Sequence, residues 1–187
     1  HWNINDLEKS GEVNFKAMVK SDYHIKRLGD RNFVLKVEAQ LDDGNNVIVA
    51  ESESKVVGRI DIKTSAFFRD ASSGILNQGP FSPKADNSTQ YTIHWEIINY
   101  SNDARNIVVR AKLPDYVKFT NTTKSNISNQ PAYNSNSGEV IWEVGRVSAT
   151  KGVVSDPLEA IFQVSATPPS SFIRQYLPLI GETLVSG

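Results

Sequence analysis

Residues 88–113, with the sequence STQYTIHWEIINYSNDARNIVVRAKL, decide the fold. Apolar side chains occupy every second position on both sides of a polar turn at residues 99–103, which is the period of a β-strand that buries one face. The spacing predicts two strands joined as one β-hairpin, and Pro114 ends the second strand. The side chains that we expect on its buried face are Tyr91, Ile93, Trp95, Ile97, Ile107, Val109, Ala111 and Leu113.

The same alternation recurs along the chain and predicts an all-β fold. Two stretches rich in Gly, Pro, Asn and Ser, 70–90 and 121–138, are expected to be surface loops. No window has the period of an amphipathic helix, so the strands should pack as an antiparallel β-sandwich whose core also contains Trp142, Val144, Phe162 and Val164. The further strands are expected at 13–19, 33–41, 47–49, 56–68, 116–120, 140–144 and 158–166.

Composition limits the classes of function. The chain has 187 residues, of which 20 are basic and 21 acidic, so it has no net positive field to hold nucleic acid or an anionic membrane. No apolar run approaches the ~18 residues that span a bilayer, and the first residues lack the features of a signal peptide. Either the chain is cytosolic or its export signal lies outside this sequence. The absence of cysteine excludes disulfides and fits both compartments.

An internal repeat divides the chain. The pattern W-x-[IV]-x-x-[LV] occurs at residues 2–7 and again at 142–147, an offset of 142 − 2 = 140 residues. Each copy precedes an alternating apolar strand, at 13–19 and 158–164. The repeat predicts three parts, which are residues 1–57 as the back half of an upstream β-module, residues 58–167 as a complete immunoglobulin-like β-sandwich, and residues 168–187 as a linker and strand that lead to a following module.

Several motifs of the central part point to one family. They are the Gly-Pro-Phe-Ser-Pro run at 79–83, Tyr-Thr-Ile at 91–93, Leu113-Pro114, and Gly138 shortly before Trp142. Together they resemble the tandem immunoglobulin-like repeats of bacterial cell-surface proteins, a family catalogued as a numbered domain of unknown function, over about residues 59–166. The resemblance implies an exported, surface-displayed β-sandwich that serves as a spacer or adhesive unit, and it implies no catalytic residues.

The residue types that carry most enzyme chemistry are scattered. His1, His24 and His94 are far apart in the sequence, and there is no cysteine to join them in a metal site. Glu139 and Glu143 share a strand face, but four residues at ~3.3 Å each place their backbones ~13 Å apart, beyond the ~5–9.5 Å between the carboxyl groups of a glycosidase. We therefore expect no enzyme, no metal and no cofactor.

Three polar features have simple structural interpretations. His94 alternates with Trp95 and is expected on the solvent-facing side of its strand. Glu51 and Glu53 should lie along a solvated strand edge. The Asp-Asp-Gly-Asn-Asn cluster at 42–46 lacks the spaced carboxylates of a calcium loop and predicts a hairpin turn.

Two hypotheses for the function remain. The leading one is a non-enzymatic structural or interaction module of an exported, repetitive surface protein, such as a stalk, adhesin or filament unit, which contacts neighbouring copies through strand edges. The alternative is a carbohydrate-binding β-sandwich module that contacts a cell-surface glycan or protein through exposed loop aromatics. The candidate binding residues are Phe81, Tyr100 and Tyr133.

The ends of the chain carry a further expectation. A half module at 1–57 leaves an apolar face and unpaired strand edges open to water, so strands from upstream or from a neighbouring copy should complete it. Residues 172–187 are expected to extend away from the complete domain toward the next unit. The side chains expected to be buried only when those missing strands are present are Trp2, Ile4, Phe15 and Val19.

Overall fold

The computed structural model describes residues 12–18, 24–42, 44–172 and 175–187. Within these ranges the regular structure is β-strand apart from one short 3₁₀ helix, which confirms the predicted all-β class. The elements are β1 (Val34–Asp42), β2 (Val47–Lys55), β3 (Ile60–Phe67), β4 (Thr89–Asn99), β5 (Ala104–Lys112), β6 (Val117–Ser125), β7 (Ala132–Asn134), β8 (Glu139–Val147), β9 (Leu158–Ala166), the 3₁₀ helix η1 (Ser170–Phe172) and β10 (Leu184–Ser186).

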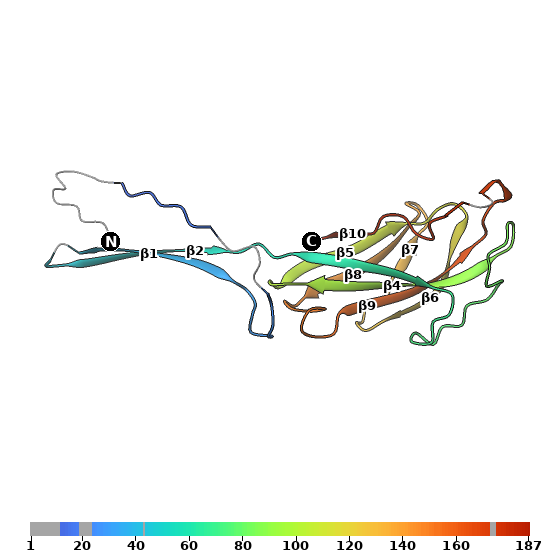
Figure 1. Ribbon diagram of the computed structural model, residues 1–187, viewed down its shortest axis with the longest axis horizontal. Coiled ribbons are helices and arrows are strands. Elements are labelled where there is room, and N and C mark those ends of the chain that lie inside the picture. The colour runs from blue at the N-terminus through green and yellow to red at the C-terminus, as the bar shows by residue number, and fades with distance from the viewer. Residues whose placement is uncertain (1–11, 19–23, 43, 173–174) are drawn as a thin grey trace.

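Two four-stranded antiparallel sheets form the main body. One, the β4 sheet, has the order β3-β4-β9-β6, and the other, the β5 sheet, has the order β10-β5-β8-β7. The sheets lie face to face as a β-sandwich, as the sequence predicts (Figure 1). The two-stranded β1–β2 hairpin is a third, separate sheet.

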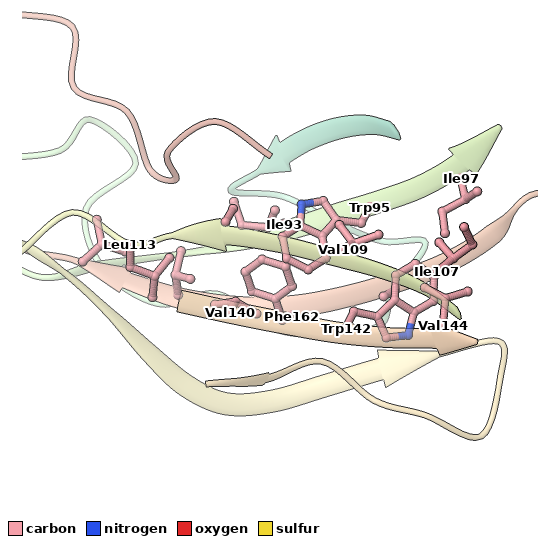
Figure 2. Packing of buried hydrophobic residues seen from close by; sticks show 14 of the residues in the cluster. Ile93, Trp95, Ile97, Ile107, Val109, Leu113, Val140, Trp142, Val144 and Phe162 are labelled. Carbon is pink, nitrogen blue, oxygen red and sulfur yellow. The ribbon is translucent and has the colours of Figure 1, made fainter. Parts of the chain in front are cut away.

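The core lies between the two sheets and contains the predicted apolar residues. Trp95 of β4 and Phe162 of β9 pack edge to face with ring centroids 4.8 Å apart. Trp142 of β8 enters the same cluster from the opposite sheet, and neither tryptophan is exposed to solvent (Figure 2). Tyr91 is the exception among the predicted core residues, since it is only half-buried at the margin of the cluster. Alternating apolar positions thus identify the inner face of each long strand.

The predicted hairpin at residues 88–113 is wrong, because β4 and β5 do not pair. β4 lies between β3 and β9, whereas β5 lies between β8 and β10 in the other sheet. The chain crosses from one sheet to the other at the turn, where the side-chain nitrogen of Asn99 donates to the carbonyls of Asn102 (2.7 Å) and Val147 (3.1 Å). Apolar alternation shows which face of a strand is buried. It does not distinguish a hairpin from a crossing between two facing sheets, because the pattern is the same in both.

Several strand boundaries also differ from the predicted ones. β2 and β6 continue to Lys55 and Ser125, through polar or small residues that show no apolar alternation. The predicted loop at 121–138 contains β7, a short edge strand. Residues 12–18 pair with no described strand, so a strand at 13–19 is not formed there, and Phe15 is 58% exposed. Trp2, Ile4 and Val19 lie outside the described residues.

The β1–β2 hairpin projects from one end of the sandwich (Figure 1). Its two strands pair from Val34 opposite Lys55 to Asp42 opposite Val47, which confirms the predicted turn at their tip. The base of the hairpin is held by the turn between β4 and β5. There the Asn32 amide donates to the Ser101 carbonyl (2.7 Å), and the Asn102 side chain donates to the Val56 carbonyl.

The C-terminal segment folds back on the domain, so the expectation that residues 172–187 extend away from it is wrong. β10 pairs with β5, placing Val185 opposite Val109. Upstream of β10, the Gly181 amide donates to the Lys112 carbonyl (2.8 Å) and the Tyr116 hydroxyl to the Pro178 carbonyl (2.7 Å). The segment supplies a backbone partner to β5, whose edge would otherwise present unpaired amides and carbonyls.

Candidate functional site

The loop between β3 and β4 covers the outer face of the β4 sheet. Most residues on this outer face of β4 and β9 are polar and would face water in a simple two-layer sandwich, yet Thr92, His94 and Gln163 are buried. Ser73 and Ile75 of the loop are themselves buried on this face. The predicted surface loop is therefore a third, partial layer, and it creates a polar interior outside the main core.

His94 lies at the centre of this polar interior, which corrects its prediction as a solvated strand residue. Its side chain is 6% exposed and lies between two carboxylates. Nε2 is 2.7 Å from Asp70 Oδ2 in the covering loop, and Nδ1 is 2.8 Å from Glu159 Oε1 on β9. The register is still the predicted one, because Trp95 points into the core while His94 points outward, and the loop then buries the outward side chain.

The charge state of Asp70 follows from its hydrogen bonds. Its side chain is only 2% exposed. Burial raises the pKa of Asp70, but hydrogen bonds from Ser73, His94, Ser72 and Thr92 outweigh it and hold the pKa well below its usual value. An ionised Asp70 accepts a hydrogen bond from Nε2 of the imidazole, and the Glu159 contact uses Nδ1. Both nitrogens of His94 are thus occupied, which leaves neither one to accept a proton from a substrate or to bind a metal.

A second set of hydrogen bonds fastens the same loop to the neighbouring strands. Gln163 Nε2 donates to the Leu76 carbonyl (3.1 Å) and to Asn77 Oδ1 (2.9 Å), while the Thr120 hydroxyl donates to Gln163 Oε1 (2.9 Å). The Lys124 ammonium donates to the Ser73 carbonyl. These contacts satisfy buried polar groups that would otherwise destabilise the fold, so the cluster acts as a brace for the loop.

The structure does not bring the three predicted aromatic residues together. Tyr100 lies in the turn beside the hairpin base, Phe81 lies in the loop that precedes the other end of β4, and Tyr133 lies on the edge strand β7. Phe81 is 67% exposed, and the Arg69 guanidinium lies 5.4 Å from its ring centroid. The three side chains therefore do not form one binding surface.

Tyr100 belongs to the junction between hairpin and sandwich. Its hydroxyl donates to Asp61 Oδ2 (3.2 Å), and the Arg59 guanidinium lies 5.1 Å from its ring centroid. In the same turn, Asp103 Oδ1 accepts the Ala149 amide (2.9 Å), and this hydrogen bond lowers the pKa of Asp103. The turn thus joins the start of β3 and the β8–β9 loop, which gives Tyr100 a structural role.

Of the three predicted aromatic residues, Tyr133 has an exposed ring face on which a ligand could stack. One face of its ring stacks on Phe119, with centroids 6.0 Å apart and ring planes 19° apart, and the side chain is 42% exposed. The ring borders a hollow of about 540 Å³ that is lined by Asn129, Gln130, Asn134 and Glu143 among others. An aromatic face beside amides and a carboxylate is a suitable surface for a sugar ring.

A second, more apolar hollow lies at the end of the sandwich where β4 begins. It has a volume of about 530 Å³, and its lining includes Tyr91, Tyr116, Pro168 and Phe172. No sequence pattern predicts it, because the hollow forms only when the segment after β9 folds back over the sheet. Tyr91, whose side chain carries a polar hydroxyl at the start of an otherwise apolar strand face, is the sequence signal that could have marked it.

Two of the other acidic residues considered in the sequence have structural partners. Glu51 forms an ion pair with Lys36 (2.8 Å), and Asp42 Oδ1 accepts the Gly44 amide (2.8 Å) within the hairpin turn. Among the described residues, no group of three or more His, Asp or Glu side chains is arranged to hold a metal ion. No described helix has the length and apolar character that crossing a membrane requires.

No protein-family model matches the chain, and no curated protein is significantly similar to it.

Proposed function

We propose that this chain is a non-enzymatic structural and interaction module of a repetitive protein exported to the cell surface. The observation that supports the proposal most directly is the projecting hairpin. One of its faces carries Leu35, Val37, Leu41 and Ile48, which are 42–63% exposed. A ribbon with an open apolar face favours docking against another folded body over isolation in water.

The closed geometry of the polar cluster supports a non-enzymatic role. Among the described residues, His94 lies within hydrogen-bond distance of two carboxylates. Catalysis by this histidine would need one of its ring nitrogens to reach a substrate. Both nitrogens are within hydrogen-bond distance of carboxylate oxygens, and the covering loop encloses them. The cluster is better suited to fixing the loop than to turning over a substrate.

Surface accessibility in the source cells tests the proposal. Antibodies raised against the purified chain should label intact cells, and protease added to intact cells should remove the labelled epitope. A cytosolic protein of the same cells serves as the control and should stay protected. Labelling that appears only after lysis would contradict an exported surface module.

A carbohydrate-binding module is the second candidate, and the hollow beside Tyr133 favours it. The exposed face of Tyr133 can stack on a sugar ring while Asn129, Asn134 or Glu143 hydrogen-bonds to its hydroxyls. A glycan array would identify the ligand, and titration would give its affinity. Tyr133→Ala should then weaken binding at least about tenfold, the loss of ~1.4 kcal/mol of stacking and apolar contact.

Tyr176→Ala is the matched control for that titration, because Tyr176 is fully exposed and lies outside the lining of this hollow. Equal losses in both variants would rule out the Tyr133 hollow as the sugar site. An array on which no glycan binds saturably leaves the structural module as the function.

A further inference from the structure

The two faces of the β1–β2 hairpin differ in charge. Residues directly opposite in the ladder share a face, so Leu35, Val37 and Leu41 lie on the same side as Ser54, Ser52 and Ile48. The other side carries three exposed valines and all the charged residues of the two strands, and Lys36 and Glu51 form an ion pair there. The first face therefore has the composition of the inner face of a sandwich strand pair.

The sequence repeat extends into the start of this hairpin. Leu28-Gly29-Asp30 matches Ile180-Gly181-Glu182, and further upstream Glu12-x-x-Phe15 matches Glu159-x-x-Phe162. The offset is 142 − 2 = 140 residues at the tryptophans, 159 − 12 = 147 at the glutamates and 181 − 29 = 152 at the glycines, so the second copy is longer by seven and then by five residues between these matches. With the offset of 152 residues, residues 33, 34 and 35 correspond to residues 185, 186 and 187. The start of β1 thus corresponds to β10 and its continuation.

β10 shows where a strand at this position of the repeat lies. It pairs with the edge of β5 that faces away from β8, with Val185 opposite Val109 and Ser186 opposite Val108. Val185 packs against the sandwich core. A Cβ added to Gly187 would clash with the Ile107 side chain and lie 2.9 Å from the Arg105 carbonyl oxygen. The chain therefore still follows β5 at that point, and a larger residue there requires the Ile107 side chain and the added strand to shift.

The side-chain faces agree with this correspondence. Val185 lies on the same face as Val109, and a Cβ at Gly187 would meet the Ile107 side chain; Val109 and Ile107 are both buried in the core. Their counterparts by the 152-residue offset are Phe33 and Leu35, and every second residue after them in β1 is apolar or small up to Leu41. The apolar face of the hairpin therefore has the register that would continue the inner face of the β5 sheet.

We propose that the β1–β2 hairpin docks on a second copy of this sandwich, where β1 displaces β10 and pairs with the same edge of β5. The inference rests on the proposed function, since it names the partner and the contact of the interaction module. The extended sheet has the order β2-β1-β5-β8-β7, with Val34 opposite Val108 and Leu35 opposite Ile107 of the other copy. Its apolar face then covers the core beside the β5 edge, and its charged face remains in water.

Disulfide trapping tests this register, because the natural chain contains no cysteine. One full-length chain carries Val34→Cys, and a second carries Val108→Cys together with Val185→Pro, which weakens β10 by removing a ladder donor. After mixing and mild oxidation, a disulfide-linked heterodimer is expected. If Val185→Pro prevents folding, as judged by circular dichroism, Val185→Ser weakens the inward packing of β10 and replaces it.

Two controls make the result specific. Lys55→Cys lies opposite Val34 but on β2, so its Cα is one strand spacing, about 4.8 Å, farther from β5, and it should give at least about tenfold less heterodimer. In a single chain, Val108→Cys with Ser186→Cys should form an internal disulfide, which shows that position 108 can react across this edge.

The outcomes separate the two proposals. Equal trapping from positions 34 and 55, or none while the internal disulfide forms, would overturn the docking of β1 on β5. Antibody labelling of intact cells reports export independently of this register. Cells that are labelled although trapping fails would retain the surface module and discard only this contact.

Discussion

The two buried tryptophans occupy similar places but differ in their hydrogen bonds. The indole nitrogen of Trp142 donates to the Asn129 carbonyl at 3.0 Å. The indole nitrogen of Trp95 is buried and has no hydrogen-bond partner among the described residues. Truncating Trp95 to alanine would leave a large cavity in the core, with an expected cost of about 3–5 kcal/mol in the free energy of unfolding.

Replacement by phenylalanine should separate packing from hydrogen bonding. Trp142→Phe loses packing volume and also leaves the Asn129 carbonyl without its donor, whereas Trp95→Phe loses packing volume alone. We expect Trp142→Phe to cost about 1 kcal/mol more in the free energy of unfolding, measured by urea denaturation. A larger loss for Trp95→Phe would show that its indole nitrogen has a partner in solution.

Asp70 should make the stability of the domain sensitive to acid. Its pKa is lowered in the folded state, so its contribution to stability is fully present above the unfolded-state pKa of about 3.9 and is lost as the pH falls toward the folded-state pKa. From roughly pH 5 to pH 2, the range in which carboxylates titrate, the free energy of unfolding of the natural chain should fall more steeply than that of Asp70→Asn.

The comparison isolates Asp70 because the other carboxylates, Asp103 included, remain in both chains and their titration cancels. Chemical denaturation at a series of pH values measures the two slopes. At neutral pH, Asp70→Asn should already be less stable by about 1–3 kcal/mol, since a buried charged partner of His94 is removed. Parallel slopes in acid would contradict a lowered pKa for Asp70.

At this scale the sequence predicted the core side chains and missed the polar cluster. The burial of Ile93, Trp95 and Ile97 was predictable because the alternation of apolar residues within one strand is visible in the local sequence. His94 becomes buried only through Asp70, which is distant in sequence and lies in a loop without periodicity. No local pattern could report that contact.

Among the elements, the loop between β8 and β9 has a close approach that depends on glycine. Gly152 has φ +78°, and a Cβ there would lie 2.7 Å from the Ile97 carbonyl oxygen on β4. Gly145 in β8 has the same φ, but a Cβ there would meet nothing within 4 Å. The two positions share their backbone conformation and differ only in their surroundings.

Alanine at each glycine should therefore have unequal effects. Gly145→Ala should cost about 1–2 kcal/mol for a left-handed conformation, and Gly152→Ala should cost a further ~1–3 kcal/mol for the clash with β4. Thermal and urea unfolding of the two variants measures the difference. Equal costs would mean that the β8–β9 loop can move away from β4 without loss.

The strands themselves were predictable where one face is buried, and their pairing was not. β1, β4, β5, β8 and β9 were all expected from alternation, whereas β7 and β10 are three-residue edge strands with too few positions to show it. The crossing between the sheets depends on Asn99 contacting the loop after β8, which only the folded structure brings near.

At the scale of the whole molecule, contacts of the β4–β5 turn attach the base of the β1–β2 hairpin to the sandwich. The Asn102 side chain donates to the Val56 carbonyl, and its Cβ lies close to Gly58 in the connection to β3. The Asp103 amide donates to the Asn32 side chain (3.0 Å) on the other strand of the base. A single turn therefore contacts both chain segments at the hairpin base.

Asn102→Ala should loosen the hairpin without unfolding the sandwich. The variant removes the hydrogen bond to Val56 and leaves the core intact, so the global unfolding free energy should change by only about 0.5–1.5 kcal/mol. Limited proteolysis should become faster within residues 56–59, which connect the hairpin to β3. An unchanged cleavage rate would indicate that the contacts of Asn32 suffice to hold the base.

The candidate site was predictable only in part. Tyr133 was expected to be exposed, but its stacking on Phe119 and the hollow around it depend on β7 lying beside β8. Tyr100 and Phe81 have the same sequence features as Tyr133, namely an aromatic ring in a polar, turn-rich stretch. Their separation at different ends of the sandwich arises from the sheet topology, which their neighbours in sequence do not encode.

The sheet topology also has a kinetic consequence. Most sandwich pairs join strands that are distant in sequence, such as β4 with β9 and β5 with β10, whereas β1 and β2 are joined by a short turn. Long-range pairing places the sandwich among domains that fold in milliseconds to seconds, while a hairpin closes in about 1–10 μs. During synthesis or refolding the β1–β2 ladder therefore forms and dissolves many times before any β5 edge exists to receive it. In that interval the charged face of the ribbon, with Lys36 and Glu51, is what opposes aggregation between nascent chains.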